Sequence, residues 1–310
     1  MHTSNSFRRR AWLAALLSAG LLGLSAPVVQ AGSARTMTPV TPPGMGQLGR
    51  GGPGGRDPLS RATRTTADED DLIELMTKAI HPDFKEDVFT FARLIYSSSG
   101  GGFGRRFWDD DTPDADLNLG FRLYQVTSLK VHPGFKYITI TPENLAAHPF
   151  VYLAATAGMN LTNEEVRYLH TYMTNGGFVM AEDFWGDSQW AHVFAEVKRI
   201  FPDREIVELP LSHPIFHQVF EFRYRPQMPS VGIFLRTGQA YDPADYTTDH
   251  DPHYYAVSDD KGRMMMLICR NNHYGDGWEH EGDDHRYFDL FSEPQAYPMM
   301  INILFYTMTH

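Results

Sequence analysis

The stretch FVYLAATAGMNLTNEEVRYLHTYMTNGGFVMAED, residues 150–183, decides the fold. It begins and ends with short, continuous apolar runs, Phe150 to Ala155 and Phe178 to Ala181. Runs of this kind are typical of strands that are buried on both faces, as in a parallel sheet covered by helices. The stretch therefore predicts two strands of a mainly parallel sheet.

The residues between the two runs predict a helix. Thr162 and Glu165 have the spacing of a capping box, in which each side chain accepts a hydrogen bond from the other residue's backbone. The helix is expected to continue through Thr174 and to end at Gly176-Gly177. Because a helix of this length carries the chain back across the sheet, the two strands are expected to be parallel and joined by a right-handed crossover.

The same alternation continues on both sides of this unit. Upstream, Val88 to Tyr96 predicts a first strand, and Thr112 is expected to cap a helix whose first position is Pro113. Downstream, a helix begins near Ser188 and ends before Pro202. Its apolar face has helical spacing and is formed by Trp190, Val193, Phe194, Val197 and Phe201.

The C-terminal part of the chain predicts antiparallel pairing. Glu205 to Leu209 is expected to form a further strand. Tyr254 to Val257 and Met264 to Cys269 flank the turn sequence at 259–262, which is a hairpin signal, and 301–310 is helical by pattern. The sequence therefore predicts a three-layer, doubly wound α/β protein with a mainly parallel sheet and an antiparallel hairpin near the C-terminus.

The N-terminal segment predicts export. Residues 1–31 contain three arginines, an apolar run and a small-x-small site that ends at Ala31, after which cleavage is expected. The paired arginines leave general and twin-arginine export both open, and the glycines and proline in the run disfavour a retained membrane anchor. Residues 32–67 are rich in Gly and Pro and predict a flexible linker, so 68–310 is expected to be a single domain in the periplasm or outside the cell.

Charge and cysteine content exclude several functions. The chain has a formal net charge of -11, and its first 67 residues hold eight arginines and one aspartate, so residues 68–310 carry -18. Binding a phosphate backbone needs clustered Lys and Arg, so nucleic acid is excluded as a partner. The single cysteine, Cys269, lies in an apolar run and is expected to be inert core.

Polar residues follow three of the predicted strands. In open α/β sheets ligands bind outside the carboxyl ends of the strands, so these residues are expected to meet on one acidic, tryptophan-bearing rim. Asp109 to Asp111 belong to the first of the three groups on this rim. The candidate ligand-binding residues are Asp114, Asp116 and Asn118; Glu182, Asp183 and Trp185; and Asn271, Asp276, Trp278 and Glu279.

Functional and structural interpretations of this rim compete. Paired carboxylates act as acid and base or hold a divalent cation, and an indole beside an acid suits a sugar ring. Alternatively, Asp114 and Asp116 are helix-start residues, and 276–284 is a solvated acidic loop. Glu182 and Asp183 favour function, because two acids directly after a buried strand need partners.

Other motifs are weaker. The glycine-rich loop 97–106 lacks the spacing of phosphate-binding loops, and no GxSxG motif supplies a serine nucleophile. Histidines such as His253, His273 and His280 lie among acids without HExxH spacing. No metal ligands are therefore assigned, and the presence of a divalent cation is left open.

Four blocks of the sequence resemble the bacterial domain of unknown function 4159 family. They are WDDDTPDADLNL from Trp108, the stretch from Tyr152 to Phe184, SHPIFHQVFEF from Ser212, and NNHYGDGWE at 271–279. The resemblance covers about residues 86–310 and is most specific at 161–183. It implies a class I glutamine amidotransferase-like, flavodoxin-like sandwich, and no activity is established for the family.

The resemblance also implies that a nucleophile is missing. In glutamine amidotransferases a cysteine occupies the sharp turn after the central strand, whereas the comparable turn here reads Ala155-Thr156-Ala157-Gly158-Met159. The leading hypothesis is therefore an exported protein that binds a carbohydrate or an envelope component at the acidic rim. The alternatives are a glycan hydrolase that depends on carboxylates or a divalent cation, and a structural partner in an envelope protein complex.

Overall fold

The computed structural model describes residues 73–310 apart from residue 81 and the segments 83–87, 99–106 and 244–246. The expected signal, residues 1–31, and linker, residues 32–67, lie outside the described residues. Within the described part, a short helix over 73–78 precedes the first strand. No helix in that part is both long and apolar enough to cross a membrane.

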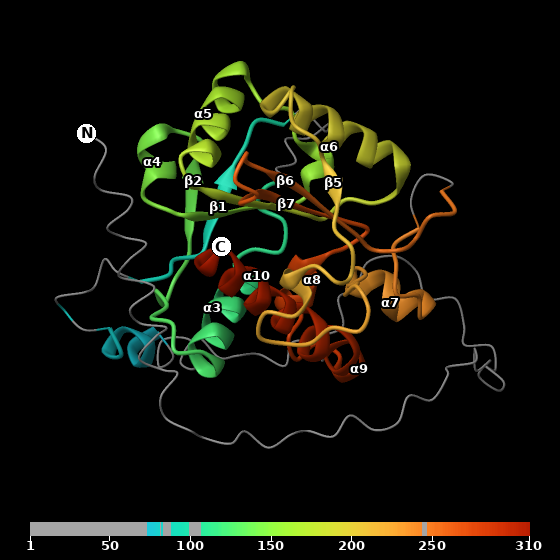
Figure 1. The fold of residues 1–310 in the computed structure, drawn as a ribbon. Coiled ribbons are helices and arrows are strands. Elements are labelled where there is room, and N and C mark those ends of the chain that lie inside the picture. The colour runs from blue at the N-terminus through green and yellow to red at the C-terminus, as the bar shows by residue number, and fades with distance from the viewer. Residues whose placement is uncertain (1–72, 81, 83–87, 99–106, 244–246) are drawn as a thin grey trace.

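A seven-stranded mixed sheet forms the centre of the molecule (Figure 1). Its spatial order is β2-β1-β3-β4-β7-β6-β5, and the pairs from β2 to β7 are parallel whereas β6 pairs antiparallel with both β7 and β5. The predicted hairpin is confirmed. The strands are β1 (Ala92–Ile95), β2 (Lys136–Thr139), β3 (Phe150–Leu153), β4 (Phe178–Ala181), β5 (Val207–Glu208), β6 (His253–Ser258) and β7 (Met264–Arg270).

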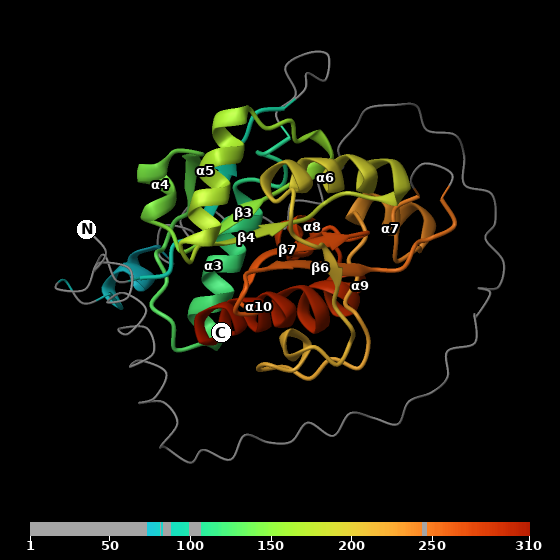
Figure 2. The ribbon, with the colours of Figure 1, turned by 45° about the horizontal axis from the view of Figure 1, so that its top comes forward.

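Helices cover both faces of the sheet, as Figures 1 and 2 show. One face carries α4 (Pro142–Ala146), α5 (Asn163–Thr174) and α6 (Gly186–Ile200). The other carries α3 (Asp114–Val126), α8 (Tyr274–Glu279) and α10 (Tyr297–Thr309). The other helices include α7 (Val231–Thr237), α9 (His285–Tyr287), the π-helix Phe288–Ala296 and two short 3₁₀ helices, Thr156–Gly158 and Pro214–Phe216.

Alternate side chains of the central strands fill two separate cores. On β3, Val151 and Leu153 pack in the core that includes α5 and α6, whereas Phe150 and Tyr152 pack in the core that includes α3 and α10. Because both faces are buried, the strand is apolar along its whole length. The capping box of α5 is confirmed: Thr162 and Glu165 each accept from the other's backbone.

Several local predictions are wrong. Thr112 does not cap α3: its hydroxyl donates to the Asp109 carbonyl, and no side chain caps this helix, which begins at Asp114. Phe194, expected on the buried face of α6, is 41% exposed. Residues 276–279 are helical and belong to α8, so they are not part of a solvated loop.

The sequence interpretation also missed two elements between α3 and β3. The edge strand β2 exposes three of its four side chains, and α4 has only five residues. Neither has a continuous apolar run or an extended apolar stripe, which are the patterns that reveal buried strands and long helices.

Candidate functional site

The carboxyl ends of the parallel strands converge on a buried polar site. Asp183 follows β4, Asn271 follows β7, and Asp111 precedes α3; all three have left-handed backbones, with φ of 57°, 56° and 64°. Asp and Asn tolerate this region better than most residues, but it still has a conformational cost. Three such residues at one end of a sheet direct attention to that end as a functional site.

His273 lies at the centre of this site and faces three carboxylates. Its Nε2 is 3.1 Å from Asp111 Oδ2, 3.7 Å from Asp183 Oδ2 and 3.7 Å from Asp276 Oδ1. We refer to Asp111, Asp183, His273 and Asp276 as the acid-histidine cluster. Two strand ends, a loop and helix α8 supply its members, so the cluster exists only in the folded chain.

Burial and mutual charge set the protonation of the cluster. Burial by itself would lower the pKa of His273, but the carboxylates of Asp183, Asp276 and Asp111 raise it well above its ordinary value. Burial raises the pKa of Asp276 to about 6 against the attraction of His273. Burial would also raise the pKa of Asp111, yet the charge of His273 holds it below the usual value.

Backbone groups and a glycine position the acids. The Val231 N–H at the start of α7 donates to Asp276 Oδ2 at 2.6 Å. Gly275 makes room for Asp111, because a Cβ at this position would overlap the Asp111 carboxylate. The first contact holds α8 against the start of α7, and the second lets the first turn of α8 lie against the loop that carries Asp111.

Glu182 lies directly behind the cluster. Its carboxylate accepts hydrogen bonds from the Tyr152 hydroxyl and from the Tyr274 N–H, the latter at 2.7 Å, and it is fully buried. Burial raises the pKa of Glu182 to about 7, with His273 opposing the shift. Glu182 is therefore a proton-holding group next to the cluster, with no exposed surface of its own.

Asp116 has a structural partner. Arg93, a fully buried arginine of β1, binds Asp116 through two nitrogens at 3.2 and 2.9 Å, and its third nitrogen donates to the carbonyl oxygens of Trp108 and Asp110. The pair therefore holds the loop that carries Asp111. An arginine within an otherwise apolar strand is the signal that predicts such a partner.

A second histidine extends the site along α8. His280 Nε2 is 2.9 Å from Glu279 Oε2 and 3.6 Å from Asp276 Oδ1, and its Nδ1 is 2.7 Å from Asp283 Oδ2. Burial would lower the pKa of His280, but its hydrogen bond to Glu279 and the Asp276 charge raise it to about 9. We refer to Glu279 and His280 as the outer pair.

The structure brings together part of the predicted rim. Asp183 and Asp276 belong to the cluster, Glu182 lies behind it, Asp116 supports its loop, and Glu279 joins it through His280. The other five predicted residues have different positions or partners, and they are Asp114, Asn118, Trp185, Asn271 and Trp278.

Three of these five have structural roles. Asn118 donates to the carbonyl oxygens of Trp278 and Glu279 at the end of α8. Asn271 accepts from the Gly186 N–H and donates to the carbonyls of residues 249 and 251. Trp278 is fully buried against Phe91 and Tyr152, so the expectation that it presents a stacking surface is wrong.

The other two lie outside the cluster. Asp114 is exposed in the first turn of α3, as its structural interpretation predicts. Trp185 precedes α6 and is 5% exposed, and its buried indole nitrogen has no hydrogen-bond partner in the described part of the chain. The observed site is therefore narrower than the expected rim, and neither predicted tryptophan, Trp185 or Trp278, is exposed in it.

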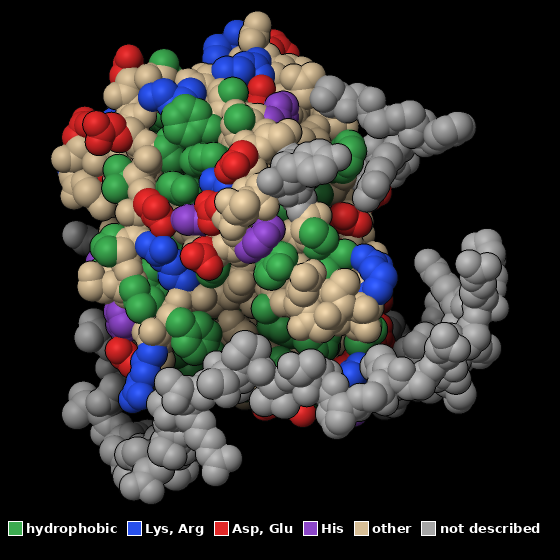
Figure 3. Space-filling view, turned by 90° about the vertical axis from the view of Figure 1, so that its right-hand side faces the viewer, with side chains coloured by type: hydrophobic (Ala, Val, Ile, Leu, Met, Phe, Trp, Pro, Cys, Tyr) green, Lys and Arg blue, Asp and Glu red, His purple; other side chains and the backbone are tan. Residues whose placement is uncertain are grey.

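Sequence reasoning placed Asp111 on the rim without selecting it as a ligand-binding residue, and it missed His273 and His280 as site residues. The spacing of His273, Asp276 and His280, at i, i+3 and i+7, is a signal that could have found two of them, because it aligns side chains on one helical face. Two groups offer ligand atoms within 4.8 Å of one another and could hold a metal ion: Asp111, His273 and Asp276, and Asp276, Glu279 and His280. Acidic and histidine side chains also lie close together on the surface of one face of the molecule (Figure 3), whereas the side chains of the acid-histidine cluster are only 4–15% exposed.

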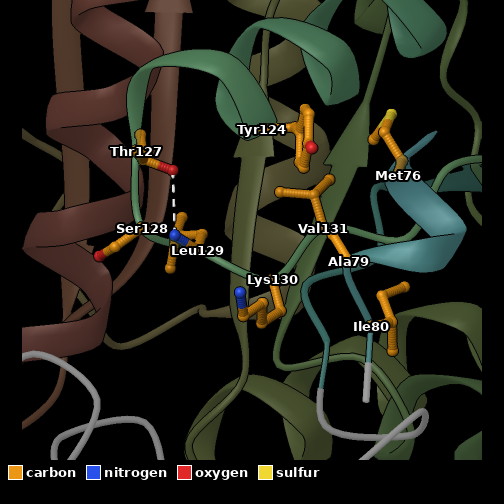
Figure 4. A pocket seen from close by; sticks show the side chains of 9 residues that line it. All are labelled: Met76, Ala79, Ile80, Tyr124, Thr127, Ser128, Leu129, Lys130 and Val131. Carbon is orange, nitrogen blue, oxygen red and sulfur yellow. Dashed lines mark hydrogen bonds between the residues drawn. The ribbon is translucent and has the colours of Figure 1, made fainter. Parts of the chain in front are cut away.

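A separate cavity of about 240 Å³ lies at the opposite end of the strands (Figure 4). Val131 lines it and pairs with Phe89, which precedes β1. Its lining combines aliphatic side chains with the hydroxyls of Tyr124, Thr127 and Ser128, and Lys130 is the one charged residue among the nine. It therefore offers no acid-base pair and no metal ligand set, and we place the candidate site at the cluster instead.

Comparison with known proteins adds a family and no activity. The sequence profile of a family described as a domain of unknown function (DUF4159) matches residues 90–308. A search of curated proteins found no match.

Proposed function

The chain belongs to the DUF4159 family, a domain of unknown function, and from its own site we propose that it is an exported protein that binds a carbohydrate or another hydroxyl-rich envelope component. The ligand would bind at the acid-histidine cluster. One observation carries this proposal: three carboxylates, those of Asp111, Asp183 and Asp276, face a single imidazole. Carboxylate oxygens left over by the histidine are acceptors for the paired hydroxyls of a sugar.

A glycan hydrolase is the second candidate, and the pKa values of the cluster favour it. Burial raises the pKa of Asp276, whereas His273 holds the pKa of Asp111 low, so near pH 6 one carboxyl carries a proton and its neighbour does not. Two nearby acids with pKa values shifted apart can act as an acid and a base. In this case Asp276 would donate to the leaving oxygen and Asp111 would act as the base.

We also propose the amidotransferase-like kinship. The winding of the parallel strands outward from β1 supports it, as does Ala155, which follows β3 with a left-handed backbone at φ 46° and ψ 47°. Ala155 stands in a sharp turn of the kind that carries the cysteine in amidotransferases. The neighbouring hydroxyl of Thr156 is fully buried and donates to the Glu182 carbonyl, so it supplies no replacement nucleophile.

Export and ligand binding have separate tests. N-terminal sequencing of protein recovered from the periplasm should begin after Ala31, and intact protein in the cytosolic fraction would contradict export. For binding, the processed protein is screened by thermal shift against a panel of mono- and oligosaccharides. A ligand present at a hundred times its Kd stabilises the fold by about 2.7 kcal/mol, which a melting experiment resolves.

Matched variants decide whether a shift arises at the cluster. Asp183→Asn should remove it, whereas Asp249→Asn, which changes an aspartate beside a different histidine, should retain it. An equal shift in both variants would place the ligand elsewhere. Turnover of a glycan by the wild type that disappears in Asp276→Asn would favour the hydrolase over a binding protein.

A further inference from the structure

We propose that the acid-histidine cluster and the outer pair hold two divalent transition-metal ions that share the carboxylate of Asp276. Asp111, His273 and Asp276 would bind the first ion, with Asp183 beside it, and Asp276, Glu279 and His280 the second. The inference deepens the proposed function because it concerns the same site, but it is tested without any sugar.

The hydrogen bonds of His273 carry the argument. Ser230 donates its only hydroxyl proton to Asp242, so the Ser230 oxygen, 3.3 Å from His273 Nδ1, can only accept from that nitrogen. In the neutral imidazole the proton is therefore on Nδ1, and the Nε2 lone pair faces the three carboxylates. A divalent cation at Nε2 would contact all three carboxylates, whereas a single proton there would satisfy one of the three acceptors.

His280 repeats this arrangement. Its Nδ1 is 2.7 Å from the Asp283 carboxylate, and its Nε2 faces Glu279 and Asp276. Metal-binding histidines commonly donate their other ring N–H to a carboxylate or a hydrogen-bonded relay that fixes the ring. Both imidazoles therefore have the outer partner of a metal ligand, and both direct Nε2 toward Asp276.

Distances, donors and charge agree with two ions. Ligands bonded to one ion at 2.0–2.1 Å in a tetrahedron lie about 3.3 Å apart, and the Nε2–oxygen separations at the two histidines run from 2.9 to 3.7 Å. One imidazole with carboxylates at each centre suits Zn²⁺ or Mn²⁺ more than Ca²⁺. The four carboxylates of the cluster and the outer pair would balance two divalent ions.

The site also contains the glycine that the first centre needs. Gly275 precedes Asp276 on α8, and its missing side chain is what allows the Asp111 carboxylate to lie against the helix. His253 provides the contrast, because each of its nitrogens has its own carboxylate, Glu208 at 2.9 Å and Asp249 at 3.1 Å. A histidine near acids is therefore not sufficient; the excess of acids around one nitrogen is the distinguishing feature.

The test is metal stoichiometry. The processed protein is stripped with a chelator, dialysed against Zn²⁺ or Mn²⁺ and assayed by elemental analysis and calorimetry, with Mg²⁺ and Ca²⁺ as competitors. The wild type should bind two ions per chain and His280→Ala one, while His253→Ala should retain two. Asp276→Asn should weaken both ions.

Ser230→Ala tests the proposal without removing any metal ligand, so a loss of metal binding in this variant cannot be explained by a missing ligand. It should weaken the first ion about 10–100-fold, as loss of an outer partner does. One ion in the wild type, or two ions in the folded double variant His273→Ala/His280→Ala, would overturn the proposal. Two ions without any sugar-induced shift would leave it standing while the proposed function fails.

Discussion

His253 and His273 both lie between carboxylates, yet their surroundings differ. His253, on β6 near the sheet edge, gives each nitrogen to one acid, Glu208 or Asp249, and each acid also contacts an arginine. His273 presents one nitrogen to three acids, and the buried arginine nearby is already bound to Asp116. Exposed ion pairs contribute little to stability, whereas buried acids depend on every partner.

An excess of acids over cations indicates a ligand-binding site only where the acids are buried. In the His253 group each acid contacts both His253 and an arginine. The acids are also about 40% exposed, so water screens any charge that these contacts leave uncompensated. The acid-histidine cluster has side chains that are 4–15% exposed and keeps more acid than cation. Only in the second case would a bound cation compensate buried carboxylates.

The largest expected effect is on the buried arginine beside the cluster. Arg93→Met leaves Asp116 as an uncompensated buried charge and frees the loop that leads to Asp111, and it should lower the free energy of unfolding by about 3–5 kcal/mol. Arg225→Met, which removes a partly exposed partner of Glu208, should cost about 0–1 kcal/mol. Urea unfolding measures both. Equal losses of unfolding free energy in the two variants would contradict the difference between the buried cluster and the exposed His253 group.

A pH effect of opposite sign should distinguish the two regions. The pKa of Glu182 is about 7 in the fold against an ordinary 4.5, so the folded state holds a proton that the unfolded state releases. Its contribution is present below about pH 4.5 and is lost as the pH rises through 7, a change of roughly 3 kcal/mol. Unfolding free energies at pH 4.5 and 7.5, with chelator present, should show this decline in the wild type and a smaller decline in Glu182→Gln.

Asp249 should behave in the opposite way. Burial acts to raise its pKa, but His253 and Arg270 hold the pKa below the ordinary 3.8. Its contribution is therefore present above about pH 4 and is lost as the pH falls further. Asp249→Asn should flatten only the acid limb of the stability profile, and a changed slope between pH 4.5 and 7.5 in this variant would contradict the assignment.

The central unit of the fold was predictable from local signals. Phe150 to Ala155 and Phe178 to Ala181 are apolar throughout, and the Thr162 capping box fixes the start of α5, so composition, capping and burial agree. β2 was not predictable in this way, because its side chains are mostly exposed and its place depends on pairing with β1.

The site was predictable only in part, for a related physical reason. The strand-end rule found Glu182 and Asp183 because their position follows from β4 alone. Asp111 and His273 are 162 residues apart, and their contact depends on how α8 packs against the loop before α3. No local sequence pattern predicts that packing. Two residues are consistent with it after the fact: Arg93, which binds the loop that carries Asp111, and Gly275, which leaves room for the Asp111 side chain.

The smallest expected changes in stability come from replacing two glycines, one inside the candidate site and one outside it. A methyl group at Gly275 would overlap the Asp111 carboxylate, so Gly275→Ala should displace Asp111, lower the free energy of unfolding by about 1–3 kcal/mol and remove the first metal ion. At Gly232, in α7, a Cβ has no neighbour within 4 Å, and alanine forms helix better by about 1 kcal/mol. Gly232→Ala should therefore stabilise the protein and keep both ions. Urea unfolding and zinc stoichiometry on the same two samples make the measurement, and full zinc binding by Gly275→Ala would show that Asp111 is not a ligand.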